Sequence, residues 1–498
     1  MKPIQILVFL LVVLIALSGV QLLIPPNFEV HGLPVKVFDF KSFLYSKSDF
    51  KSEQTQTQKT KLQKLQIETE RLLISESTDS SQTFVQSDLV ADTNGGQPLP
   101  EISFHIDSAS GIQYPAGDST ILYPFFAELD SLRSKKKLIR ILHFGDSQIE
   151  GDRISGYIRQ RLQQKFGGCG PGLLPLYEEQ ASRFPVEIKS KYPAERYIIY
   201  GKMVPVGHRN YSVLHSAFRL KADTSIENGL LNNTFSFGLN SAGYKKSGYY
   251  EKATILFRNP KSKVDFNIYF SGKEPILKKA LQSDSFKLLD IRTEGKKHKF
   301  SFSVDSNVEN DFYGVCLDCN YGVAVDNIPL RGSSGLDILK IRPQFLQEQI
   351  QRLDVKLVIL QFGINVVPYQ VKSFAWYESS LVRVIQTIKK SKPDIQVLVV
   401  GVSDMAKKSD GKWDSYASIE AIRIAQKNAA TRTNSAYWDL YQVMGGANSI
   451  QAWANTNPPL AGKDYIHLTP KGAQVVGEFL FQAIQKGKMK TNKNEKNI

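Results

Sequence analysis

The sequence predicts an α/β protein in which helices cover both faces of a parallel β-sheet. Short apolar segments typical of buried strands alternate with segments whose apolar residues recur at helical spacing, over residues 138–166 and again over residues 356–484. Between these two parts, residues 200–312 alternate apolar and polar residues, which predicts an all-β insert. An apolar run at the N-terminus predicts a transmembrane helix ahead of both.

The N-terminal run covers residues 4–24 and follows Lys2. About 20 residues at a rise of about 1.5 Å each are long enough to cross a bilayer. The run continues into Pro25 and Pro26 without a clear small-x-small cleavage site, so the sequence favours an uncleaved anchor over a cleaved signal peptide. In both cases we expect the rest of the chain to be exported, either anchored to the inner membrane and facing the periplasm or secreted.

Composition and the alternation of elements divide the chain into six parts. Ser, Thr, Gln and Lys dominate after the anchor and predict a flexible spacer, and Lys is frequent at the C-terminus. The predicted parts are the anchor or signal (1–26), the spacer (27–100), the first part of the α/β domain (101–199), the inserted β-sandwich (200–312), the second part of the α/β domain (313–488) and a basic tail (489–498).

Charge and cysteine content narrow the possible functions. The net charge of +15 is spread along the chain without a nucleic-acid-binding motif, so we expect no nucleic-acid partner. Cys316 and Cys319 form a C-x-x-C pair, for which a structural disulfide and two buried thiols both remain open. Only Cys169 supplies a further sulfur, so we predict no metal, no other cofactor and no redox role.

The elements of the α/β domain follow one another in a regular order. We predict its strands at residues 138–144, 356–361, 395–402 and 436–440. Apolar residues at helical spacing follow at residues 154–166, 381–388, 419–430 and 475–484. Thr469 and Pro470 form a favourable N-cap and first-turn pair for the last helix.

The insert is rich in aromatic residues. Its residues 263–270 and 299–304 alternate as in half-buried strands. Tyr244, Tyr249 and Tyr250 could stack on sugar rings, although aromatic residues are also ordinary core of a β-sandwich.

Two segments place polar residues where strands of the predicted sheet end. Ser147 follows the first strand in the triplet Gly-Asp-Ser, and Asn365 ends the triplet Gly-Ile-Asn after a later strand. Ligands gather at the carboxyl edge of such sheets. Taken alone, each triplet also fits an ordinary turn or a helix cap.

A third segment, from Asp464 to His467, comes directly before the last predicted helix. A carboxylate three residues ahead of a histidine can hold its Nδ1 and leave Nε2 free to accept a proton from a serine hydroxyl. The three segments therefore predict a catalytic triad of Ser147, Asp464 and His467, with the Ser147 and His467 side chains within about 6 Å.

Together, the three segments resemble the motif blocks of the SGNH/GDSL hydrolase superfamily, over about residues 138–167 and 313–486. The resemblance implies a flavodoxin-like sheet and ester hydrolysis through an acyl-serine intermediate. The glycine of the family's remaining block best matches Gly332, with Gly335 as the fallback. The implied oxyanion hole consists of the backbone N–H groups of Ser147 and Gly332 and the side-chain amide of Asn365.

The same resemblance implies substrate contacts near the nucleophile, from Asp146, Gln148 and Gly363. Gln148 departs from the family pattern, because many members carry His there. No G-x-S-x-G elbow surrounds a plausible serine, which argues against an α/β-hydrolase.

Within the superfamily, the anchor, the insert and the glycine-containing segments near residues 166–172 and 444–453 look most like the peptidoglycan O-acetylesterases. This likeness implies an esterase that removes O-acetyl groups from a cell-envelope glycan, with peptidoglycan as the expected substrate and partner. It also implies a jelly-roll-like insert that resembles a carbohydrate-binding module. Two alternatives remain open. An O-acetyltransferase would use the same triad with a sugar hydroxyl as acceptor, and a glycan-binding protein would bind without turnover.

Overall fold

The computed structural model describes residues 29–30, 33–34, 111–177, 186–191, 194–200, 206–220, 231–239, 243–270, 274–306, 309–369, 371–409 and 411–495. The chain divides into two compact units, Met1–Lys61 and Leu62–Ile498. In the first unit, β1 (Glu29–Val30) pairs with β2 (Leu33–Pro34) in antiparallel orientation. The predicted membrane helix and most of the predicted spacer lie outside the described residues. None of the helices in the described ranges is both long and apolar enough to cross a bilayer.

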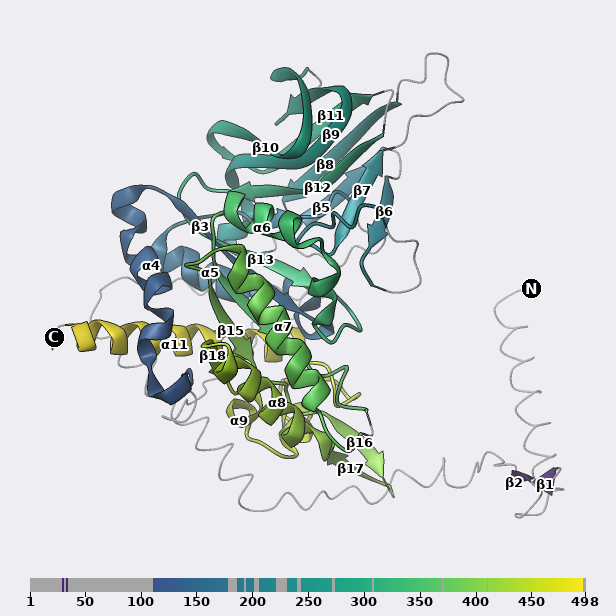
Figure 1. Ribbon diagram of the computed structural model, residues 1–498, viewed down its shortest axis with the longest axis vertical. Coiled ribbons are helices and arrows are strands. Elements are labelled where there is room, and N and C mark those ends of the chain that lie inside the picture. The colour runs from purple at the N-terminus through teal and green to yellow at the C-terminus, as the bar shows by residue number, and fades with distance from the viewer. Residues whose placement is uncertain are drawn as a thin grey trace. The chain divides into compact units, whose positions relative to one another are not determined.

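A five-stranded parallel sheet forms the centre of the second unit (Figure 1). Its order is β13-β3-β14-β15-β18, and every neighbouring pair is parallel. The strands are β3 (Leu138–Gly145), β13 (Gly322–Pro329), β14 (Val355–Gln361), β15 (Gln396–Val400) and β18 (Ala436–Trp438). The helix-covered parallel sheet predicted from the alternation is confirmed.

Successive residues of each strand enter different cores, one on each face of this sheet. Val358 and Leu360 of β14 join one core, whereas Leu357 and Ile359 join the other. This alternation follows from the period of two in a strand. The first core packs against α6 (Pro343–Arg352), α7 (Ala375–Ser391) and α8 (Ser418–Arg432). The second packs against α4 (Tyr123–Lys135), α5 (Ser155–Phe166), α9 (Leu440–Met444), α10 (Ser449–Ala454) and α11 (Pro470–Glu495).

Two features at the C-terminal side of the unit complete the α/β part. A hairpin of β16 (Ala406–Ser409) and β17 (Lys412–Ser415) follows β15. The final helix α11 reaches Glu495 and so includes most of the basic tail predicted for residues 489–498.

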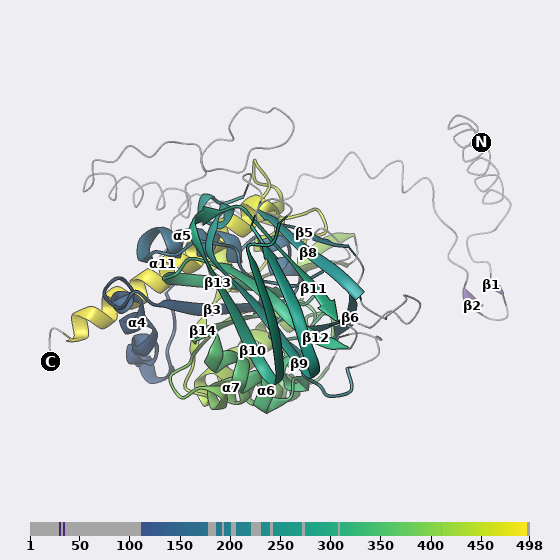
Figure 2. The same cartoon turned by 90° about the horizontal axis from the view of Figure 1, so that it is seen from above.

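The predicted all-β insert is present as one curled sheet, with nine strands among the described residues. Its strands are β4 (Gly172–Leu174), β5 (Val186–Ser190), β6 (Glu195–Ile198), β7 (Ser216–Leu220), β8 (Leu231–Leu239), β9 (Tyr250–Tyr269), β10 (Leu277–Lys297), β11 (Lys299–Ser306) and β12 (Asn310–Asp318). They extend beyond both bounds of the predicted range 200–312. Figure 2 shows β9, β10, β11 and β12 side by side.

The insert forms one sheet, and not the predicted sandwich of separate sheets, because β9 is long enough to pair with two different strands along its length. Its first half pairs with β12 and its second half with β11, so hydrogen bonds continue around the curl. The curl encloses a core of its own that is rich in phenylalanine.

Two of the three tyrosines considered as sugar-stacking residues are structural. Tyr250 is fully buried in the core of the insert. The Tyr244 ring meets the ring of Tyr157 from α5 edge-on, with centroids 5.9 Å apart. Lys296 Nζ lies 4.5 Å from the centre of the Tyr249 ring. The insert therefore uses Tyr244 and Tyr250 for packing.

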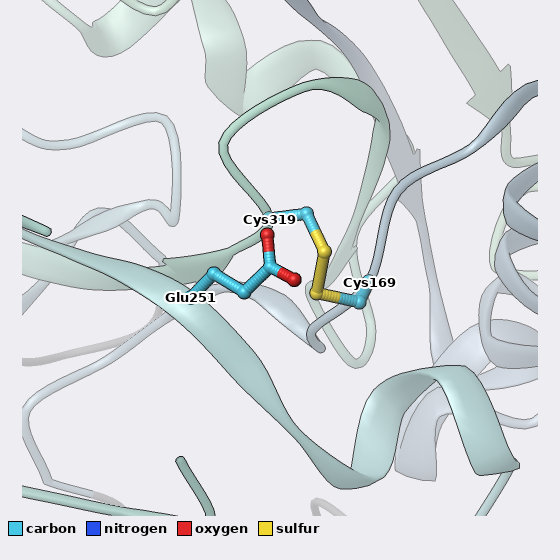
Figure 3. Close-up of side chains that lie close together, drawn as sticks. All are labelled: Cys169, Glu251 and Cys319. Atoms are coloured by element: carbon cyan, nitrogen blue, oxygen red, sulfur yellow. A yellow bond between two sulfur atoms is a disulfide. The ribbon is translucent and has the colours of Figure 1, made fainter. Parts of the chain in front are cut away.

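A disulfide joins Cys169, after α5, to Cys319, after β12 (Figure 3). The sequence separation is 150 residues, and Cys316 is a buried free thiol, so a disulfide within the C-x-x-C pair is excluded. The Glu251 carboxylate lies near both sulfur atoms. Since thiolates are the metal-binding form of cysteine, the bonded sulfurs are not available as ligands. The bond closes a loop that contains the whole insert, which in the chain-entropy model stabilises the fold by about 5 kcal/mol.

A buried ion cluster also joins the insert to the parallel sheet. The Arg140 guanidinium on β3 donates to Asp318 at the end of β12 and to Asp326 on β13, each at 2.6 Å. All three side chains are almost completely buried. Removing one partner would leave a buried charge uncompensated, which makes this cluster a specific connection between the two parts.

Candidate active site

Ser147 lies at the carboxyl end of β3, where it begins a short 3₁₀ helix, η4 (Ser147–Asp152). Asp146 caps this helix by accepting the N–H of Gln148 at 3.0 Å. A Cβ atom on Gly145 would come within 2.9 Å of the carbonyl oxygen of Gln361 on the neighbouring strand β14. The Gly-Asp-Ser order is therefore explained locally: Gly145 allows the close approach to β14, Asp146 caps η4, and Ser147 begins it.

The structure brings the three predicted triad residues together. Ser147 Oγ lies 2.9 Å from His467 Nε2 across 320 residues of sequence. His467 Nδ1 lies 2.7 Å from Asp464 Oδ2. The predicted proximity of Ser147 and His467 is thus confirmed. If Nδ1 carries the proton that faces the carboxylate, Nε2 can accept the serine proton.

Asp464 is held by more than the histidine ring. Its Oδ1 accepts the backbone N–H groups of Ile466 and His467, each at 3.1 Å. Burial acts to raise the pKa of Asp464, but the hydrogen bonds from the His467 ring and these N–H groups outweigh it and lower the pKa. The carboxyl therefore stays ionised at neutral pH, where it can stabilise an imidazolium.

Two residues of the predicted oxyanion hole are connected through one short segment. Gly332 has φ +80, and a Cβ atom there would meet the Tyr200 hydroxyl at 2.9 Å. Asn365 Nδ2 donates to the carbonyl oxygen of Ser333 at 3.0 Å, which uses one of its two N–H groups. The N–H of the fallback glycine, Gly335, is already donated to Ser333 Oγ at 2.9 Å. Gly332 is therefore the better candidate of the two.

Asp146 and Gly363, predicted to contact substrate, hold the nucleophile and asparagine segments together. Asp146 is buried, and its carboxyl accepts backbone N–H groups of Gly363 and Ile364. Burial raises the pKa of Asp146 to about 7, against the effect of these hydrogen bonds. Gly363 has φ +132, and a Cβ atom there would lie 2.8 Å from Val402 Cβ. Both residues therefore support the positions of Ser147 and Asn365.

Gln148, also predicted to contact substrate, holds both sides of the histidine. Its side chain is 2% exposed. Nε2 donates to the carbonyl oxygen of Ile466 at 2.7 Å, and Oε1 accepts the N–H of Leu468 at 3.3 Å. A carboxamide supplies both the donor and the acceptor that these two backbone groups need. The Gln148 side chain therefore faces the His467 segment from within the protein.

Arg153 is a supporting residue that the sequence did not reveal. Its guanidinium donates to the carbonyl oxygens of Ser147 at 2.6 Å, Glu150 at 2.7 Å and Leu468 at 2.9 Å. It therefore bridges the nucleophile and histidine segments. Backbone carbonyls are present at every residue, so no side-chain pattern in the sequence marks them as partners of an arginine.

Comparisons with known proteins agree with this geometry. Residues 293–475 match the model of the GDSL-like Lipase/Acylhydrolase family, a range that includes Asn365, Asp464 and His467 and begins after Ser147. The chain is similar in structure to a peptidoglycan O-acetylesterase, with 17% identity and a TM-score of 0.60, over 74% of this chain and 96% of that one. No curated protein sequence matches the chain.

Two further structures show weaker similarity. The acetyl xylan esterase AlAXEase is 18% identical, with a TM-score of 0.26, over 32% of this chain and 81% of that one. A family two carbohydrate esterase from Cellvibrio japonicus is 8% identical, with a TM-score of 0.24, over 61% of this chain and 98% of that one. The family match over residues 293–475 and the fold shared with the O-acetylesterase both agree with the SGNH/GDSL resemblance found in the sequence and with a carboxylic ester hydrolase.

Proposed function

We propose that this chain is a serine esterase that removes O-acetyl groups from a cell-envelope glycan, with peptidoglycan as the substrate. The observation that carries the proposal is the Ser147–His467–Asp464 arrangement, with distances of 2.9 Å and 2.7 Å. The fold shared with a peptidoglycan O-acetylesterase supports the choice of substrate.

In the proposed mechanism, Ser147 Oγ attacks the carbonyl carbon of the ester while His467 Nε2 takes the serine proton. The bond to the sugar oxygen then breaks, and that oxygen leaves as a hydroxyl with the proton from His467. Water attacks the acyl-serine in the same way, which releases acetate and restores Ser147. The negative oxygen of each tetrahedral intermediate is stabilised by the N–H groups of Ser147 and Gly332 and by the Asn365 amide.

We also propose that the enzyme lies outside the cytoplasm. Residues 4–24 would hold it to the inner membrane, with the catalytic domain in the periplasm. The apolar run supports export. The Cys169–Cys319 disulfide supports it independently, because disulfides persist in oxidising compartments. Fractionation of cells that express the full chain tests this: recovery from the membrane fraction is expected, and soluble cytoplasmic protein would contradict it.

The catalytic proposal is tested with the full-length protein on two substrates. We expect release of acetate from O-acetylated peptidoglycan and hydrolysis of p-nitrophenyl acetate, with slower hydrolysis of longer acyl esters. Ser134→Ala, at an exposed position on α4, is the control for Ser147→Ala. Transfer of the acetyl group to an added sugar in place of acetate release would indicate an O-acetyltransferase. Binding to the glycan without any turnover would leave the chain a glycan-binding protein.

A further inference from the structure

Two aromatic side chains stand exposed just after the Asn365 segment. Tyr369 is 51% exposed and Trp376 is 40% exposed. Their ring centroids lie 6.1 Å apart, and the ring planes differ by 20°. Val371, between them in sequence, is 45% exposed. The two exposed rings are therefore stacked nearly parallel, and we call them the aromatic pair.

The aromatic pair lies at the same edge of the parallel sheet as the triad. Tyr369 and Trp376 follow β14 and precede or begin α7, and residues that follow a parallel strand lie at its carboxyl edge. Tyr369 is four positions after Asn365, which limits the distance between their Cα atoms to about 14 Å. The N–H of Tyr369 donates to the carbonyl oxygen of Val366, so the intervening chain turns and the separation is shorter than this limit.

Contacts below the aromatic pair connect it to the oxyanion segment. Tyr377, adjacent to Trp376, is fully buried, and its hydroxyl donates to the carbonyl oxygen of Ser334 at 3.2 Å. The preceding carbonyl, that of Ser333, accepts the Asn365 side chain. The base of α7 is therefore fixed relative to Asn365, and the aromatic pair has a defined position beside the site.

We propose that Tyr369 and Trp376 bind a glycan strand by stacking on a sugar ring one or two residues away from the acetylated sugar. This inference rests on the proposed function and adds a binding position for the glycan polymer. The flat, amphipathic faces of Tyr and Trp suit the apolar faces of sugar rings. Contacts remote from the ester add binding energy for a polymer that a small acetyl ester does not receive.

The surroundings favour a glycan over a lipid bilayer as the occupant. Lys372 and Ser373 are exposed within the same segment, and both carry polar groups that suit sugar hydroxyls. An interfacial membrane site typically presents a continuous apolar helix face. The aromatic pair with Val371 offers only three such side chains, on a turn and at the start of a helix.

The test compares the double variant Tyr369→Ala/Trp376→Ala with the parent and with Tyr321→Ala. Tyr321 is 44% exposed and lies just before β13, at the opposite edge of the parallel sheet, so it is a matched control. For each full-length protein, the rate of acetate release from O-acetylated peptidoglycan is divided by the rate on p-nitrophenyl acetate. We expect this ratio to fall about tenfold in the double variant, equivalent to about 1.4 kcal/mol, and to stay unchanged in Tyr321→Ala.

A binding measurement separates this inference from the proposed substrate. Each variant is combined with Ser147→Ala, and its sedimentation with insoluble peptidoglycan and with insoluble acetylated xylan is measured. Loss of sedimentation with either glycan in the double variant supports the aromatic pair even if the parent releases no acetate from peptidoglycan. Trp376→Phe, which keeps a ring face, should retain most of the binding.

Three outcomes would overturn the inference. The first is an unchanged rate ratio together with unchanged sedimentation in the double variant. The second is an equal loss on both ester substrates with a lowered melting temperature, which would make the pair a packing element. The third is loss of binding to phosphatidylglycerol vesicles with no loss of glycan binding, which would assign the pair to a membrane surface.

Discussion

The aromatic residues in the core of the insert and those that follow β14 in the parallel-sheet domain differ in exposure. In the insert, Phe235, Phe266 and Phe302 pack face to face or tilted inside the curled sheet, and Tyr250 joins them in the core. In the parallel-sheet domain, Tyr369 and Trp376 are exposed in the segment that follows β14 and Asn365. Aromatic content therefore does not identify a sugar-binding region, whereas position relative to the carboxyl edge of the sheet gives a physical reason to expect one.

The largest expected effect on kcat comes from substitution of the nucleophile Ser147. Ser147→Ala should lower kcat on p-nitrophenyl acetate by roughly 10⁴-fold or more, because both chemical steps require the serine oxygen. The melting temperature should change little, since the substitution removes only one hydroxyl, whose hydrogen-bond partner is the half-buried His467 ring. Steady-state kinetics and thermal melts check both statements. Substantial activity in this variant would remove Ser147 from its assigned role.

A substitution in the core of the insert should have the opposite effect, a loss of stability with little change in kcat. Phe302→Ala removes a fully buried ring from the core of the curled sheet and should lower the free energy of unfolding by roughly 3–5 kcal/mol. The kcat of the fraction that remains folded should be close to that of the parent. Denaturant titration measures the first quantity and active-site-normalised kinetics the second. A kcat loss without destabilisation would show that the insert contributes to chemistry.

Acidification should affect both regions through two buried histidines. Burial lowers the pKa of His143, on β3, and of His215, just before β7 of the insert, to about 4 each. The unfolded chain binds these protons near pH 6.5, so between pH 6.5 and about 4 it binds more protons than the folded chain. The free energy of unfolding should therefore fall by roughly a few kcal/mol across this window as the pH is lowered.

A substitution of His215 tests how much of this pH-dependent loss of stability comes from that residue. His215 is buried, and neither of its ring nitrogens has a hydrogen-bond partner among the described residues, whereas His143 bonds to Gln361 and Ser155. His215→Phe should keep neutral-pH stability and reduce the slope of unfolding free energy against pH. An unchanged slope would mean that His215 is protonated in the folded protein over this range.

At the oxyanion site, Asn365→Ala should lower kcat by roughly 100-fold, in line with removal of one donor to a developing negative charge. KM on a small ester should change much less, because the donor acts mainly in the transition state. The matched control is Asn428→Ala, whose side chain donates to Glu378 on the exposed side of α7. Equal effects of the two substitutions would remove Asn365 from the oxyanion hole.

The smallest expected effect concerns the two residues that hold the histidine segment. Arg153→Lys and Gln148→Glu should each lower kcat by about tenfold, because both variants weaken contacts that position Ser147 and His467 without touching the ester. KM should stay close to the parent value. Arg161→Lys, at a guanidinium that faces Tyr157 and Glu478 on the helices, is the control. A change in KM alone would instead favour contact with the substrate.

Much of the parallel-sheet domain was predictable from local pattern. The strand predicted at residues 138–144 is β3, Leu138–Gly145, and that predicted at 356–361 is β14, Val355–Gln361. Strands buried on both faces carry unbroken apolar runs that identify them. The same edge of the sheet explains why Ser147, Asn365 and His467 could be expected together.

The remaining features depend on contacts between distant parts of the chain. The two halves of β9 choose different partners, which no local alternation specifies. Cys319 pairs with Cys169 instead of Cys316, because the fold brings the ends of the insert together. Gln148 and Asp146 stand beside the nucleophile in sequence, and only the fold shows that both side chains are buried and that Gln148 holds the His467 segment.

The Cys169–Cys319 bond also determines what a cut in the insert would do. Every peptide bond between the two cysteines lies inside the loop that they close, so a protease that cleaves once in the insert would not release a fragment. The piece that carries Ser147 and the piece that carries His467 would remain one covalent molecule, also bound through the neighbouring strands β3, β13 and β14. Under reducing conditions only the non-covalent contacts would hold the two pieces of such a nicked enzyme together.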